Sequence, residues 1–133
     1  MSNMFAFCTN LNSPTNINTW NTGSVSNMTQ LFQNCENFNQ NLSSWNTGTV
    51  LSMNGMFSGC AVFNQAIGSW NTSNVVNMSN MFNGASLFNQ ALDSWSTANV
   101  TNMSYMFAGA LDFNQPIGSW NTASVTTMAY MFY

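Results

Sequence analysis

A repeat of 25 residues runs through the whole chain and constrains its fold more than any other feature. Tryptophan, threonine, valine and methionine each return at this step. The columns are Trp20, Trp45, Trp70, Trp95 and Trp120; Thr22, Thr47, Thr72, Thr97 and Thr122; Val25, Val50, Val75, Val100 and Val125; and Met28, Met53, Met78, Met103 and Met128. A fixed period of this length is typical of a solenoid, in which each coil buries its apolar face against the next. We therefore expect one repeat domain over residues 1–133, with coil boundaries near the five tryptophans.

The two ends of the chain fall at the same point of the repeat. Met4-Phe5 and Met131-Phe132 are equivalent pairs, and two extra residues around Pro14 account for their spacing. Neither end carries a divergent polar repeat that would serve as a cap, and an uncapped solenoid exposes apolar edges. We predict that Met4, Phe5, Met131 and Phe132 join copies of the chain head to tail.

The composition excludes several classes of function. The chain has no Lys, Arg or His and only three carboxylates, whereas ordinary domains carry about 25% charged residues. Without basic residues it lacks the charges that neutralise nucleic-acid phosphates. It also lacks histidine bases and lysine nucleophiles, and Glu36, Asp93 and Asp112 occupy different repeat positions. We expect neither an enzyme nor a cofactor or metal site.

The same composition argues against a disordered chain and against a membrane span. Hydrophobic residues make up 45% of the chain and aromatic residues 14%, and a disordered segment would be poor in aromatics. No apolar run approaches the length of a membrane-spanning helix, and no charged-then-apolar signal segment opens the chain. Either a signal has been removed or the chain is an internal piece of a longer protein.

One repeat unit predicts a short helix followed by a short strand. Val50, Met53, Met56 and Phe57 follow a helical spacing over residues 50–58, after the N-cap candidate Thr49. Gly59 then suits the position beyond a helix end. The equivalent helix of the next repeat would cover residues 75–83. In the following Phe-Asn-Gln stretch, residues 63–67, the side chains Phe63, Gln65 and Ile67 recur at every second position. This alternation indicates a strand that stacks into a parallel sheet.

Strand, helix and return loop in 25 residues describe a leucine-rich-repeat-like α/β solenoid of five uncapped turns. The pattern V-x-x-M-x-x-M-F-x-x-C/A-x-x-F-N-Q-x-L/I-x-x-W resembles the bacterial surface-protein repeats related to the BspA-like leucine-rich-repeat family. The resemblance covers all five turns, the first of them degenerate. It implies a secreted or cell-surface protein with an adhesive or structural role.

Several columns of polar and reactive side chains are candidate sites. We interpret the Asn column as structural, with side chains that bond backbone groups between coils; it comprises Asn12, Asn39, Asn64, Asn89 and Asn114. For the Gln column beside it, both a structural role and a binding role stay open. The Trp column is either a hydrophobic corner of the coil or a carbohydrate-stacking stripe. Cys8, Cys35 and Cys60 share a position with Ala85 and Ala110, which favours free buried thiols, although Cys35 and Cys60 would also lie near disulfide range.

Six Asn-x-Ser/Thr sequons are candidate glycosylation sites: Asn27, Asn41, Asn71, Asn77, Asn99 and Asn102. Asn27, Asn77 and Asn102 share one repeat position, so covalent glycans on them would line one face. Such glycans would supply the solubility that a net charge of −3 does not.

Two functional hypotheses follow, together with a weaker third. The first is an extracellular structural protein that stacks end to end into a fibre with copies of itself as partners. The alternative is a fragment of a cell-surface adhesin that binds host, matrix or glycan ligands. The third is ice binding by the regular threonine column.

Overall fold

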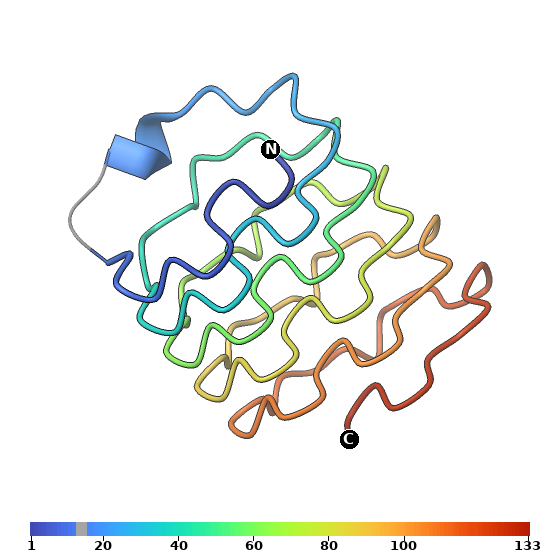
Figure 1. The fold of residues 1–133 in the computed structure, drawn as a ribbon. Helices are drawn as coiled ribbons and strands as arrows, with labels where there is room; N and C mark the ends of the chain where they lie inside the picture. Colours follow the sequence, from blue (N-terminus) through green and yellow to red (C-terminus); the bar gives the residue numbers. More distant parts are fainter. Residues whose placement is uncertain (13–15) are drawn as a thin grey trace.

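The computed structural model describes residues 1–12 and 16–133, and in it the chain winds into a stack of coils (Figure 1). The first residues lie at one end of the stack and the last residues at the other, so neighbours in space are one repeat apart in sequence (Figure 1). Parallel single-residue bridges mark this register, linking Asn27, Ser52, Asn77, Asn102 and Thr127 in turn. We use "coil" for one 25-residue unit and "column" for the residues at one repeat position.

The predicted α/β solenoid of helix and strand turns is wrong. Within the described residues, regular structure is confined to the 3-10 helix η1 (Asn16–Thr19) and to the isolated bridges. Residues 50–58 and 75–83, predicted as helices, are irregular around one bridge residue each and then form a run of turns, over residues 54–58 and 79–83. Residues 63–67, predicted as a strand, have no regular structure.

The hydrogen bonds of the backbone explain why the helical spacing does not give a helix. Met53, Gly55, Phe57 and Gly59 donate their N–H groups to the next coil, at 2.7–2.9 Å. The alternate N–H groups, of Met56, Ser58 and Cys60, donate to carbonyls three residues back, at 3.0–3.1 Å. An α-helix would direct every N–H to the carbonyl four residues back within the segment. Here alternate N–H groups join coils, and a run of three-residue turns places apolar side chains at nearly the same spacing as a helix.

Two left-handed residues in each coil make these turns. One position holds Gly59 (φ 73°), Gly84 (φ 72°) and Gly109 (φ 67°), the glycines expected just beyond a helix end. The other lies four residues earlier, and there bulky residues such as Tyr105 (φ 57°) adopt the same conformation. Gly55 and Asn80 at this position favour the left-handed region, but Gln30, Tyr105 and Tyr130 do not, so the column as a whole did not predict this second break.

Asparagine side chains replace the expected sheet in the Phe-Asn-Gln segment. The main-chain N–H of Asn64 donates to Oδ1 of Asn39 at 3.0 Å, and that of Asn89 donates to Oδ1 of Asn64 at 3.0 Å. The side-chain amide of Gln65 donates to the same Asn39 oxygen at 3.0 Å. Because a side-chain oxygen accepts the bond that a backbone carbonyl would accept in a sheet, coils are joined here without a strand. The Asn and Gln columns are structural in this sense.

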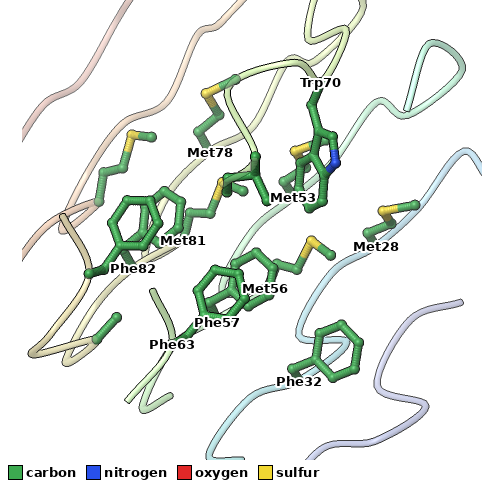
Figure 2. Packing of buried hydrophobic residues seen from close by; sticks show 14 of the residues in the cluster. Met28, Phe32, Met53, Met56, Phe57, Phe63, Trp70, Met78, Met81 and Phe82 are labelled. Carbon is green, nitrogen blue, oxygen red and sulfur yellow. The ribbon is translucent and has the colours of Figure 1, made fainter. Parts of the chain in front are cut away.

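Columns of parallel aromatic rings fill the core. Phe32, Phe57, Phe82 and Phe107 stack with ring centroids 5.5–5.8 Å apart and planes within 10° of parallel. A second phenylalanine column packs against the first, with centroids 3.9–4.0 Å apart within each coil. Figure 2 shows methionines of successive coils beside these rings. The buried residues form one continuous cluster along the stack.

Candidate functional surfaces

Four of the five tryptophans lie inside the stack and donate their indole N–H groups to the backbone, namely Trp45, Trp70, Trp95 and Trp120, whereas Trp20 in the first coil is half-buried. Trp70 and Trp95 are 3% exposed, and their indole N–H groups donate to the carbonyls of Leu42 and Ile67, each at 3.1 Å. Their rings stack 6.5 Å apart. A buried indole cannot offer its face to a sugar, so this column is the hydrophobic corner rather than a carbohydrate stripe.

Four of the five threonines of the threonine column are equally buried, and Thr122 in the last coil is exposed. Thr72 is 1% exposed, and its hydroxyl donates to the Ser96 carbonyl at 2.9 Å. Thr22, Thr47 and Thr97 make the same bond to the following coil, at 2.9 Å. These hydroxyls bond coil to coil and do not reach the surface, which removes the basis of the ice-binding hypothesis.

The cysteine column consists of free thiols. Cys35 and Cys60 are buried, and their Sγ atoms donate to the carbonyls of Phe5 and Phe32, at 2.9 and 3.0 Å, rather than bonding to each other. Burial raises the pKa of the Cys35 thiol to about 11, and raises the pKa of Cys60 further. Cys8, at the N-terminal end, is exposed. Of the three, Cys8 is therefore the thiol that reagents in solution can reach.

The sequon asparagines are also part of the hydrogen-bonded frame. The side-chain oxygens of Asn27, Asn41, Asn71, Asn77 and Asn102 each accept the N–H of the residue two positions on, at 2.8–3.0 Å. Asn99 instead donates its amide to the Ser73 carbonyl at 2.7 Å. Asn27, Asn41, Asn71 and Asn99 are exposed, and the other two are half-buried. Glycosylation at these residues remains a prediction.

The two ends of the stack expose side chains whose equivalents are buried inside it. Met4 is 55% exposed and Phe132 is 62% exposed, whereas Phe107, one coil before Phe132, is 2% exposed. Phe5 is half-buried and stacks on Phe32 at 5.6 Å, and Met131 is 7% exposed. At the C-terminal end an open depression of about 340 Å³ is lined by Phe107, Gly109, Ala110, Leu111, Phe113, Phe132 and Tyr133.

A tyrosine pair lies on the outer surface near the same end. Tyr105 and Tyr130 stack with ring centroids 5.0 Å apart, and they are 36% and 59% exposed. Tyr133 meets Tyr130 edge-on at 5.7 Å. Sequence reasoning missed this pair because neither tyrosine belongs to a column kept along the whole chain.

The described part of the chain holds no group of three His, Cys, Asp or Glu side chains that could bind a metal ion. The carboxylates of Glu36, Asp93 and Asp112 are exposed. Among the described residues, no helix has the length and apolar character needed to cross a bilayer.

These features define a class: a nearly uncharged repeat protein built as a stack of 25-residue coils, with its polar columns used to bond coil to coil. The chain belongs to the family described as Mycoplasma protein of unknown function, DUF285, whose model matches residues 1–95 and 53–133. The match is consistent with a bacterial surface repeat, but not with the BspA-like leucine-rich-repeat family specifically. No curated protein and no solved structure matches the chain.

Proposed function

We propose that the chain is an extracellular structural protein that assembles end to end, with other copies of itself as its partners. The observation that carries this proposal is the exposure of the core columns at both ends of the stack. Phe132 is 62% exposed, whereas the preceding buried members of its column, from Phe32 to Phe107, are at most 2% exposed. Met4 is 55% exposed at the other end, whereas its equivalents inside the stack are fully buried: Leu31, Met56, Met81 and Met106. A further coil would bury such side chains as the interior coils do.

The charge of the chain supports close approach of copies. With no Lys, Arg or His and a net charge of −3, two ends repel each other only weakly. When two copies join through their unlike ends, the pair keeps one free end of each kind, so the assembly does not close and grows as a filament. An extracellular location agrees with a bacterial surface repeat family.

Sedimentation velocity over a range of concentrations, followed by electron microscopy, tests the proposal. We expect species that grow with concentration and filaments of the width of one stack. Single stacks at every concentration would refute end-to-end assembly.

The alternative function is adhesion to host, matrix or glycan ligands. The stacked pair Tyr105 and Tyr130 favours it, because exposed aromatic faces bind the apolar faces of sugar rings and the surface around them is uncharged. Binding to immobilised glycans that is lost in Tyr130→Ala, but kept in Leu51→Ala, would support this function. Leu51 is a suitable control because it is 53% exposed.

A further inference from the structure

Two tyrosines in neighbouring coils lie closer together than the aromatic rings of the core columns. The rings of Tyr105 and Tyr130 have centroids 5.0 Å apart and planes 21° from parallel. In the phenylalanine and tryptophan columns, rings one coil apart are separated by 5.5–6.5 Å. The main-chain N–H of Tyr105 donates to the Ala129 carbonyl at 2.9 Å, and this bond fixes the register of the two segments. The two phenols are therefore held in contact by the fold itself.

The pair lies on the outer side of the stack, where dissolved reagents can reach it. Tyr105 has a neighbour of its own column on each side, Asn80 in the coil before it and Tyr130 in the coil after it. It is nevertheless 36% exposed. Because both axial neighbours are present, this exposure is lateral, and it belongs to the side of the stack rather than to the top of a coil.

The backbone does not explain why tyrosine occupies these two positions. Tyr105 and Tyr130 are left-handed, with φ of 57° and 56°, and bulky residues are outliers in that region. The two coils before them hold Gly55 and Asn80 at the same position, and both residue types suit this conformation. Residues held in a disfavoured conformation are concentrated at functional sites. Since neither the backbone nor the core requires these tyrosines, they call for a role of their own.

Two phenols held this close are coupled by a one-electron oxidant. Removal of one electron and one proton from each phenol gives two tyrosyl radicals, which join through ring carbons next to the carbons that bear the hydroxyl groups. Each joined carbon then loses its hydrogen as a proton, and a proton returns to each phenol oxygen, so both rings become aromatic again. The product has one new carbon–carbon bond and two hydrogen atoms fewer than the two tyrosines. With a peroxidase, hydrogen peroxide accepts these two electrons and two protons and becomes two molecules of water.

We propose that Tyr105 and Tyr130 form an oxidative cross-linking site, at which a peroxidase and hydrogen peroxide join the two rings into dityrosine. Exposed side chains change rotamer within picoseconds to nanoseconds, so the rings pass from the stacked to the joined arrangement without a change in the backbone. All three cysteines are free, so this bond is a covalent link between coils that the thiols do not supply. It closes a loop one repeat long and stabilises the stack by restricting the unfolded chain. The inference goes beyond the proposed function, because both rings belong to one chain.

The fold directs oxidation towards this pair. The four buried tryptophans are at most 9% exposed, and two of the three thiols are buried. The third tyrosine, Tyr133, meets Tyr130 edge-on, with centroids 5.7 Å apart and planes 88° from parallel. Tyr105 is nearer to Tyr130 and nearly parallel to it, so it is the favoured partner.

The scarcity of carboxylates makes such a cross-link simple to locate. Asp112 is the one acidic residue between the two tyrosines, and Asp93 is the nearest one before Tyr105. A protease that cuts at aspartate therefore separates Tyr105 from Tyr130 in the uncoupled chain, whereas dityrosine holds the two peptides together. The chain is oxidised with peroxidase and hydrogen peroxide, digested and analysed by mass spectrometry. The Cys8→Ala chain is treated in parallel, because the exposed thiol of Cys8 competes for the oxidant.

We expect a linked peptide pair that is two hydrogen atoms lighter than the sum of its parts, together with dityrosine fluorescence. Its yield should not depend on protein concentration, because the bond forms within one chain. Tyr105→Phe and Tyr130→Phe each remove one phenol and should abolish the pair. Tyr133→Phe makes the same change at the neighbouring tyrosine and is the matched control, so it should leave the yield unchanged. Oxidation in urea, which separates the coils, should also abolish the pair, and the cross-linked chain should unfold at a higher urea concentration than the untreated chain.

Three results would overturn the inference. The first is a folded chain that gives no dityrosine in either the parent or the Cys8→Ala background. The second is coupling of Tyr130 to Tyr133 alone, which would leave the two hydrogen atoms missing from the C-terminal peptide and the peptide containing Tyr105 unlinked. The third is dityrosine that forms only between chains, with a yield that rises with protein concentration. Sedimentation of the untreated chain is a separate measurement, so none of these results decides whether copies assemble end to end.

Discussion

Replacing Phe82 by alanine should remove roughly 3–5 kcal/mol from the free energy of unfolding. Phe82 is fully buried, and its ring is stacked on Phe57 at 5.8 Å, on Phe88 at 4.0 Å and on Phe107 at 5.5 Å. The substitution removes a ring that packs against both neighbouring coils, and it leaves a cavity between Phe57 and Phe107. Aromatic pairs add about 0.5–1.5 kcal/mol beyond the area they bury, so the upper part of the range is expected.

The matched control is Phe132→Ala, in the same column at the end of the stack. Phe132 is 62% exposed and stacks on Phe107 alone in this column, at 5.6 Å, so its loss should cost less than about 1 kcal/mol in the unassembled chain. Urea unfolding, followed by tryptophan fluorescence at protein concentrations too low for assembly, measures the loss in free energy of unfolding for both variants. If the slope of the free energy of unfolding against urea concentration is unchanged, the variants unfold as cooperatively as the parent. A loss below 1 kcal/mol for Phe82→Ala, or equal losses at the two positions, would refute the reasoning that stacked rings hold the coils together.

The remaining predictions concern buried polar groups and backbone strain, and all are measured by urea unfolding. Thr72→Val leaves the Ser96 carbonyl without its hydroxyl donor and should cost about 1–2 kcal/mol, whereas Thr122→Val, at an exposed residue, should change stability by less than about 0.5 kcal/mol. Gly84→Ala places a side chain at φ 72° and should cost about 1 kcal/mol or more, while Gly118→Ala meets no atom within 4 Å and should be nearly neutral. Burial raises the pKa of the Cys60 thiol above its value in the unfolded chain. The stability that the protonated thiol contributes is therefore complete below about pH 8.5 and declines at higher pH. Cys60→Ala should therefore reduce the loss of stability between pH 8 and pH 10, and an unchanged slope would contradict this assignment.

The hydrogen-bonded columns show why the surface of this protein is poor in candidate sites despite its many amides and hydroxyls. Among the described residues, every buried side-chain nitrogen or oxygen has a hydrogen-bond partner. Most of these partners are backbone groups of a neighbouring coil, as for the indole of Trp70 and the hydroxyl of Thr72. A chain with almost no charge thus uses its regular polar residues to bond coil to coil.

Sequence alone determined the period, the register and the membership of the core. The 25-residue step fixes which residues share a column, and the apolar columns, such as that of Phe57 and Phe82, are the ones found buried. This succeeds because a stack of identical coils brings equal positions together whatever path each coil takes. The structural role of the Asn column also followed from the need to pair backbone groups between coils.

Only the tertiary structure decided the path of the backbone within a coil. Spacings of three residues, as from Met53 to Met56, suit a helix and a run of turns equally, and the choice depends on where each N–H finds its acceptor. In this stack the acceptors for Gly55 and Phe57 lie in the next coil, so local propensity is overridden by bonds that exist only once coils are stacked.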